Sequence, residues 1–138
     1  MEVDLTSPAE GSGTPGVIGL GTDVVDIDRF RAVLQRTPGI VDRLYTADER
    51  ALCERRRDPA PCLAARFAVK EAVLKAMGSG LGDAGFTEIE VVRAESGQPS
   101  VRLHGGAAAR SAELGIGRWM LTISHSDLVA TATVLALA

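Results

Sequence analysis

The amino-acid sequence predicts a single α+β domain, in which helices pack against a largely antiparallel sheet. Three observations carry this prediction. The chain has 138 residues, which is enough for one domain to bury its own core. β-branched and alternating runs predict strands near both ends of the chain. Helical patterns between capping signals fill much of the rest, which gives the order β-α-α-α-β-β-α-β-β.

Residues 1–16 are expected to form a flexible tail outside this domain, which would span residues 17–138. The tail segment is rich in glycine, proline and serine and offers little to bury. We assign no function to it.

Capping residues set the boundaries of the helices in the first half of the domain. The β-branched, glycine-bounded run at 17–27 predicts the first strand. Asp26 or Asp28 can cap the helix that follows. Thr46 and Glu49 have the spacing of a capping box, which predicts that another helix begins near Ala47. The helices are expected at about 28–36, from Ala47 onward, and at about 62–77.

Turn signals divide the second half into a hairpin, a helix and a final pair of strands. Glu95-Ser96-Gly97-Gln98-Pro99 predicts the hairpin turn, and Gly115 predicts the end of the helix. A short turn at His125-Ser126-Asp127 separates the last two strands. These elements are expected at 88–93, 100–104, 107–114, 119–124 and 128–137.

Composition and charge argue against several classes of function. The net charge of −3 does not suit a general nucleic-acid binder. No run approaches the ~18 apolar residues of a membrane-spanning helix, and the acidic start lacks the apolar segment of a signal peptide. We therefore expect a cytoplasmic protein without a nucleic-acid or membrane partner. Cys53 and Cys62 lack metal-ligand spacing and are expected to be free thiols.

Glu71 is the most informative residue of the predicted helix at 62–77. An apolar stripe runs along this amphipathic helix, and Glu71 projects at its edge. A carboxylate there is costly unless a cation, a metal or a donor compensates it. Two interpretations stay open, namely an ion pair with Lys75 or a functional acid. The stripe consists of Leu63, Phe67, Leu74 and Met77.

Asp23 lies inside the apolar first strand, after a Gly-x-Gly-Thr entry that would let the backbone approach a ligand. It is either an outward-facing strand residue or a ligand of Mg²⁺, which prefers one or two carboxylates together with phosphates and water. The glycine-rich turn GSGLG at 78–82 follows the predicted helix. It is either a helix cap or a loop whose amides could meet a phosphate.

Other charged residues also have an ordinary and a functional interpretation. Lys70 and Lys75 flank the apolar stripe, where most lysines only increase solubility. His125 at a strand end is either a surface residue or a catalytic one. Arg29 and Arg36 share a face of the first helix beside apolar residues. Such a cationic rim suits an acidic helical partner, and solvated arginines are the ordinary interpretation.

Three ordered motifs together resemble one family, the 4′-phosphopantetheinyl transferases, and specifically its small holo-acyl-carrier-protein synthase type. The motifs are GLGTDVVDI at 19–27, RFAVKEA at 66–72 with KAxGxG at 75–80, and ISH at 123–125 before a terminal strand rich in alanine and valine. The resemblance runs from about residue 17 to residue 137, in order and with matching length.

The resemblance implies Mg²⁺-dependent transfer of phosphopantetheine from coenzyme A to a serine of a carrier protein, with adenosine 3′,5′-bisphosphate as the other product. It implies that Asp23 and Glu71 hold the metal and that Lys75 contacts phosphate. The general base would be Glu71 or a metal-bound water, and both stay open. Further coenzyme contacts are implied at Arg66, Lys70, Gly78, Ser79, Gly80, Ser124 and His125.

The resemblance also implies the partners of the chain. One partner is an acidic acyl carrier protein, whose helix beside the modified serine would meet Arg29 and Arg36. The other is the chain itself, in a homotrimer with sites at its interfaces. Fatty-acid and polyketide carriers both stay open. Two positions depart from the family pattern: Asp26 stands where glutamate is common, and Ser79 where threonine is frequent.

Two other classes of function remain as alternatives. A non-catalytic coenzyme A or nucleotide-binding module on the same scaffold would be expected to lack Asp23 or Glu71, and both are present. A structural oligomerisation domain would leave the two carboxylates and the glycine turn unexplained.

Overall fold

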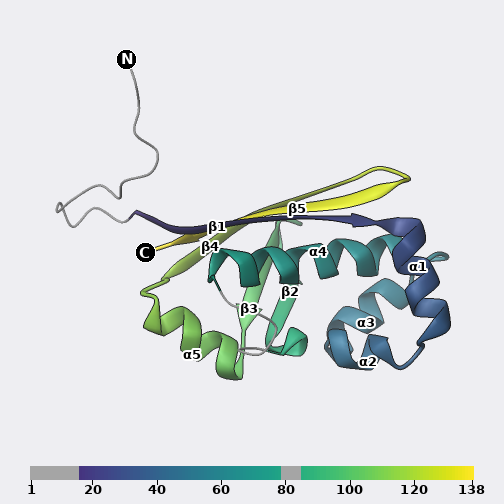
Figure 1. The fold of residues 1–138 in the computed structure, drawn as a ribbon, viewed down its shortest axis with the longest axis horizontal. Coiled ribbons are helices and arrows are strands. Elements are labelled where there is room, and N and C mark those ends of the chain that lie inside the picture. Colours follow the sequence, from purple (N-terminus) through teal and green to yellow (C-terminus); the bar gives the residue numbers. More distant parts are fainter. Residues whose placement is uncertain (1–15, 79–84) are drawn as a thin grey trace, which may run out of the picture.

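The computed structural model describes residues 16–78 and 85–138, and its elements follow the predicted order with two short additions (Figure 1). The additions are the helix α2 and the 3-10 helix η1. The elements are β1 (Val17–Asp26), α1 (Ile27–Arg36), α2 (Ile40–Leu44), α3 (Ala47–Glu54), α4 (Ala60–Ala76), η1 (Phe86–Glu88), β2 (Ile89–Arg93), β3 (Pro99–Leu103), α5 (Gly105–Glu113), β4 (Arg118–His125) and β5 (Val129–Leu137).

The described residues form two antiparallel sheets, where the sequence predicted one. β5 lies between β1 and β4 in a three-stranded sheet, and β2 pairs with β3 in a separate hairpin. Asp23 of β1 pairs with Ala132 of β5, which pairs in turn with Ile123 of β4. β1 and β4 are therefore the two edges of the larger sheet.

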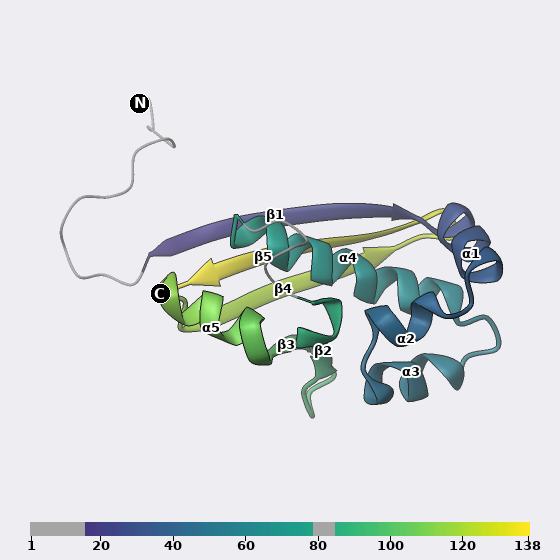
Figure 2. The ribbon, with the colours of Figure 1, turned by 60° about the horizontal axis from the view of Figure 1, so that its bottom comes forward.

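The helices lie on one side of the three-stranded sheet, with α4 directly against it (Figures 1 and 2). The opposite face of that sheet is covered by no element of the described chain (Figure 1). Within residues 16–78 and 85–138, none of the helices combines the length and the apolarity needed to cross a lipid bilayer.

Helix α4 is buried around most of its circumference, which corrects the prediction of an amphipathic helix. β1, β5 and β4 contact it on the sheet side, and α1, α3 and β2 contact it elsewhere. The predicted stripe is mostly present, since Leu63, Leu74 and Met77 are buried, but it is only part of the buried surface. Phe67 and Glu71 are half-buried. The helix also buries several alanines, namely Ala64, Ala65, Ala68, Ala72 and Ala76.

Gly19 and Gly21 are required by the close approach of β1 to α4. A Cβ atom at Gly21 would lie 1.8 Å from the carbonyl oxygen of Ala72, and one at Gly19 would lie 1.9 Å from that of Ala76. Contacts this short are not compatible with any side chain unless the backbone moves. The sequence predicted that these glycines let the backbone approach a ligand. In the structure they instead let β1 approach the main chain of α4.

The predicted caps of α1 and α3 are present. Asp26 caps α1, because its carboxylate accepts a hydrogen bond of 2.9 Å from the backbone N–H of Arg29. This decides between Asp26 and Asp28, and the helix begins at Ile27. Thr46 and Glu49 form the capping box of α3, in which each side chain accepts from the backbone N–H of the other residue.

Cys53 and Cys62 are joined by a disulfide, which corrects the prediction of two free thiols. Cys53 lies in the last turn of α3 and Cys62 in the first turn of α4. The chain reverses between these helices, which brings the two Cα atoms to 5.5 Å. Sequence spacing alone gave no sign of this reversal.

We expect Gly21→Ala to lower the free energy of unfolding by about 1–3 kcal/mol, because the added methyl group meets backbone atoms of α4. Urea unfolding followed by circular dichroism measures the difference. Gly39→Ala is the matched control, since Gly39 has helical backbone angles and an added Cβ there would meet nothing within 4 Å. The control should shift the free energy by less than about 1 kcal/mol. Equal effects at the two glycines would contradict the role given to Gly21.

Candidate active site

The structure brings Asp23 and Glu71 together on one surface groove. Asp23 is in β1 and Glu71 is in α4, and both line a groove with a volume of about 610 Å³. α1 and the start of β5 supply further walls of this groove, through residues such as Arg29 and Val129. The two carboxylates therefore face a single space although they come from distant parts of the sequence.

Lys75 links the two elements that carry these carboxylates. Its ammonium donates to Asp23 Oδ1 at 3.0 Å and to the carbonyl oxygen of Thr22 at 2.9 Å. In the described part of the chain, the ion pair of Lys75 is thus formed with Asp23 rather than with Glu71. The interpretation of Glu71 as the ion-pair partner of Lys75 is wrong, because Lys75 bonds instead to Asp23, which lines the groove.

The electrostatics of the groove favour a bound cation. Burial raises the pKa of Glu71, and the charge of Asp23 raises it further, while Lys75 opposes both. A cation between the carboxylates would relieve this repulsion. Two carboxylates suit Mg²⁺, which leaves much of its coordination shell to phosphate and water oxygens. Residues 16–78 and 85–138 contain no cluster of three or more His, Cys, Asp or Glu side chains that could hold a metal.

Aromatic rings form the apolar side of the same groove. Phe30 and Phe67 both line it, and their ring centroids are 5.4 Å apart. Phe67 also packs against Phe86 at 5.6 Å. Glu71 therefore shares the groove with two aromatic rings, and burial is the main cause of its raised pKa.

A second pocket, of about 370 Å³, is lined by three arginines and by one carboxylate, that of Asp58, which is paired with Arg31; it is called here the cationic pocket. Arg66 and His125, both predicted as coenzyme contacts, line it together with Arg56 and Arg93. Burial lowers the pKa of Arg66; the charge of Glu49 opposes this, and the charges of Arg93 and Arg56 add to it. The Nε atom of Arg66 is buried and has no hydrogen-bond partner in the described structure. An anion in the pocket would offset the positive charge of its three arginines.

The sequence did not identify Arg56 and Arg93 as site residues. Arg56 follows α3, and Arg93 ends β2, so neither lies in a recognisable motif. The run Arg55-Arg56-Arg57 was an available signal of local positive charge. Its meaning depends on the packing of β2 beside α3 and α4, which no local pattern reveals.

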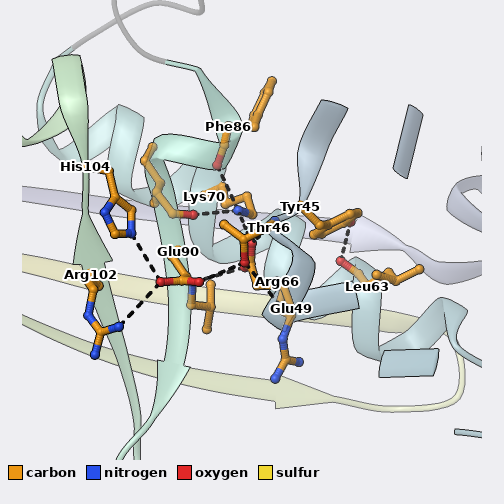
Figure 3. A network of polar contacts seen from close by, with 12 residues as sticks. Tyr45, Thr46, Glu49, Leu63, Arg66, Lys70, Phe86, Glu90, Arg102 and His104 are labelled. Atoms are coloured by element: carbon orange, nitrogen blue, oxygen red, sulfur yellow. Dashed lines mark hydrogen bonds and ion pairs between the residues drawn. The ribbon is translucent and has the colours of Figure 1, made fainter. Parts of the chain in front are cut away.

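Lys70 lies in neither pocket, which corrects its expected role as a coenzyme contact. Its side chain is fully buried, and its ammonium donates to Glu49 Oε1 at 2.8 Å and to the carbonyl oxygens of Phe86 at 2.8 Å and Ile89 at 2.5 Å (Figure 3). Burial lowers the pKa of Lys70, and the charge of Glu49 opposes this. All three donors of the ammonium are used inside the protein.

Glu49 is the centre of the polar network around Lys70 (Figure 3). Its Oε1 also accepts from the N–H of Thr46 at 3.0 Å, and its Oε2 accepts from the N–H of Val91 at 3.1 Å. Thr46 in turn donates through its hydroxyl to Glu90 at 2.8 Å. The network ties α3, α4 and β2 together, so the buried charges have a structural role.

The remaining predicted coenzyme contacts are only partly described. Gly78 follows α4 with a φ of 64°, a left-handed conformation that glycine adopts without strain. Ser79 and Gly80 lie outside the described residues. Ser124 is exposed beside His125 at the end of β4.

The predicted partner-binding arginines differ in their relation to the groove. Arg29 lines it, close to Asp23 and Glu71. Arg36 is exposed in the last turn of α1, away from the residues that line the groove. Asp26 also lines the groove, where its carboxylate is engaged as the cap of α1.

The described chain thus carries an acidic pair bonded to a lysine on one groove and a cluster of arginines on a separate pocket. The chain matches the family model of the 4′-phosphopantetheinyl transferase superfamily over residues 19–133, and it belongs to that superfamily.

Curated relatives of similar length include holo-[acyl-carrier-protein] synthases. The one from Streptomyces avermitilis is 49% identical over 120 residues, which covers 87% of this chain and 97% of the relative. The one from Frankia casuarinae is 50% identical over 120 residues, with the same two coverages.

Solved structures of holo-acyl-carrier-protein synthases share the fold. The enzyme from Neisseria meningitidis has a TM-score of 0.81 and 29% identity, covering 88% of this chain and 98% of that one. The Helicobacter pylori enzyme in complex with coenzyme A has a TM-score of 0.74 and 26% identity, covering 86% and 99%. The α+β fold predicted from the sequence is confirmed.

We expect Lys70→Met to lower the free energy of unfolding by about 3–5 kcal/mol, because it leaves the buried carboxylate of Glu49 without a cation. Lys75→Met is the matched control on the same helix, since the side chain of Lys75 is 53% exposed, and it should cost less than about 1 kcal/mol. Urea unfolding measures both. A loss at Lys70 no larger than that at Lys75 would contradict the structural role of the buried pair.

Proposed function

We propose that this chain is a holo-acyl-carrier-protein synthase. It transfers the 4′-phosphopantetheine group from coenzyme A to a serine of an apo acyl carrier protein and releases adenosine 3′,5′-bisphosphate. The observation that carries the proposal is the meeting of Asp23 and Glu71 on one groove beside Lys75, in a chain of this superfamily.

Mg²⁺ fits the acidic pair and is the proposed cofactor. Asp23 and Glu71 would hold it, and the bound ion would neutralise charge on the pyrophosphate and on the leaving group. Lys75 would keep Asp23 in place and offer its exposed ammonium to a phosphate oxygen. Phe67 would keep water from one side of the reacting phosphate.

The transfer needs no nucleophile from this chain. The carrier's serine oxygen forms a bond to the phosphorus of the phosphopantetheine group, and the bond from that phosphorus to the oxygen of adenosine bisphosphate breaks. The serine proton passes to a base in the groove. Glu71, whose pKa is raised by burial, or a water molecule held in the acidic groove could accept it.

The cationic pocket is proposed to bind the adenosine bisphosphate end of coenzyme A. Arg66 supplies a buried guanidinium with an unpartnered Nε, and Arg56, Arg93 and His125 border the same space. A phosphate there would remove the repulsion among three arginines. Gly78 and the adjoining Ser79 and Gly80 stay proposed as nucleotide contacts, as does Ser124.

A complete coenzyme site is proposed to need two chains. Within one chain, Asp23 lies on one edge strand of the sheet and His125 on the other. Phe67 and Glu71 border the acidic groove, whereas Cys62 and Arg66 border the cationic pocket. At 100° per residue, these two pairs lie on opposite sides of α4. One chain therefore offers the two halves of a site on different flanks.

The uncovered face of the three-stranded sheet supports a homo-oligomer, which we propose to be a trimer. Leu20 of β1 and Met120 of β4 are exposed on it, in register with Leu135 of β5. Val24 is 63% exposed on the same strand as Leu20. Contiguous exposed apolar surface of this kind marks interfaces.

The carrier protein is proposed to dock beside the acidic groove. Arg29 lines the groove, and in the described structure it forms none of the ion pairs, whereas Arg31 is held by Asp28 and Asp58. An acidic carrier helix would therefore meet the guanidinium of Arg29, with Arg36 further along α1. Carriers of fatty-acid and polyketide synthesis both fit this description, and we propose the cytoplasm as the place of reaction.

We expect the protein to add the mass of one phosphopantetheine to an apo carrier when coenzyme A and Mg²⁺ are present, and we expect Glu71→Gln to lower the rate at least about 100-fold. The loss follows from removing one charge that the cation needs. Mass spectrometry of the carrier measures the transfer. Glu113→Gln, an exposed change on α5, is the control and should leave the rate unaltered.

Circular dichroism must show that the Glu71→Gln protein is folded. Wild-type protein that modifies neither a fatty-acid nor a polyketide carrier would refute the proposed function. Coenzyme A binding without turnover would favour the non-catalytic binding module.

We expect Leu20→Asp to dissociate the oligomer, because a charge on the uncovered sheet face cannot be buried against another copy. Light scattering after size-exclusion chromatography gives the mass of the particle. Ala109→Asp places the same charge on the exposed surface of α5 and should leave the mass unchanged. A monomeric wild-type protein, or a trimeric Leu20→Asp variant, would contradict the proposed interface.

A further inference from the structure

The disulfide between Cys53 and Cys62 borders the cationic pocket. Cys62 is half-buried in the first turn of α4 and lines the pocket with Arg66. Cys53 is fully buried in the last turn of α3. Of the two cysteines, Cys62 is therefore the one that borders the pocket, while Cys53 is shielded from solvent.

Arg66 and the N-terminus of α4 both lie beside the sulfur of Cys62. An Nη atom of Arg66 lies 3.2 Å from the sulfur of Cys62 and 3.4 Å from its carbonyl oxygen. Cys62 is also the third residue of the 17-residue helix α4, whose N-terminal end stabilises negative charge. An adjacent arginine and a helix N-terminus are the two features that lower cysteine pKa values and make a sulfur a good leaving group.

The disulfide is connected to the pocket in two ways. Arg66 contacts the sulfur of Cys62 and is also the buried arginine of the pocket, so a thiolate at Cys62 would compete with a bound phosphate for it. Arg56 lies in the loop that the disulfide closes, between Cys53 and Cys62. Opening the bond would remove one restraint on the loop that carries Arg56, which the ion pair between Asp58 and Arg31 also holds.

We propose that Cys53 and Cys62 form a reversible redox pair, and that its reduction weakens anion binding in the cationic pocket through Arg66 and Arg56. The assignment of that anion to the coenzyme rests on the proposed function. Disulfides in reducing compartments are commonly transient and redox-sensing, which suits this arrangement.

The reaction is thiol–disulfide exchange with a dithiol reductant. A thiolate of the reductant bonds to the sulfur of Cys62, the bond between Cys62 and Cys53 breaks, and Cys53 leaves as a thiolate that takes up a proton. The second thiol of the reductant then attacks its own sulfur in the mixed disulfide. Cys62 is released beside Arg66, and the reductant becomes a cyclic disulfide, so two electrons pass to the protein.

The test compares binding of adenosine 3′,5′-bisphosphate to oxidised and reduced wild-type protein by calorimetry at pH 8. We expect reduction to weaken binding about fivefold or more. Intact mass before and after reduction and alkylation reports the state of the cysteines, and reoxidation must restore the original affinity. Equal affinities in the two states, or free thiols in protein purified without reductant, would overturn the proposal.

Two variants separate the effect of opening the loop from the effect of the new thiolate charge at Cys62 on nucleotide binding. Cys62→Ser opens the loop and removes the thiolate, whereas Cys53→Ala opens the loop and keeps Cys62 beside Arg66. We expect Cys53→Ala to bind the nucleotide like the reduced protein and Cys62→Ser to bind with intermediate affinity. Neither should respond to reductant, and a response by either would overturn the proposal.

The same samples distinguish failure of this proposal from failure of the proposed function. Protein that transfers phosphopantetheine with the same nucleotide affinity in both redox states refutes the redox pair alone. Protein that binds no nucleotide in either state refutes both. The wild-type comparison needs no substitution, so a variant that does not fold leaves the test intact.

Discussion

The site depends on the main-chain contact between β1 and α4. At Gly19 and Gly21 the strand lies so close to the helix that no side chain fits between them, and backbone atoms therefore set their separation. Asp23 follows Gly21 by two residues, and Glu71 precedes Ala72, the helix residue that Gly21 meets. Because both carboxylates lie next to this rigid contact, their relative position does not rely on flexible side-chain packing. Lys75 then adds a polar bond across the same boundary.

The buried pair of Glu49 and Lys70 fixes α4 from its other side. Lys70 directs its ammonium toward α3 and β2, and Glu71, the next residue, is thereby turned toward the groove. The pair costs desolvation energy, and its hydrogen bonds to Thr46, Val91, Phe86 and Ile89 compensate much of that cost. Glu49 also completes the capping box of α3, so one carboxylate joins a local helix signal to long-range packing.

Local sequence signals predicted most of the helices and strands. The features that they did not predict depend on packing between distant segments. The caps at Asp26 and Thr46 depend on neighbouring residues, and the structure has them as predicted. Three features could not be predicted because they depend on elements that are distant in the sequence and meet only in the folded protein. These are the burial of α4 around most of its circumference, the disulfide between Cys53 and Cys62, and the interior position of Lys70. The two carboxylates of the acidic groove, Asp23 and Glu71, could be identified from the family motifs. Arg56 and Arg93 lie outside those motifs, and only the packing of β2 beside α4 places them together.

The position of the two half-sites on opposite edge strands has a genetic consequence. In the proposed trimer each complete site combines the acidic groove of one chain with the cationic pocket of another, so every complete site is a junction between two chains. A trimer that mixes chains damaged at Asp23 with chains damaged at Arg66 contains some junctions with both lesions and others with neither. Two inactive alleles of this protein would therefore complement each other when expressed together.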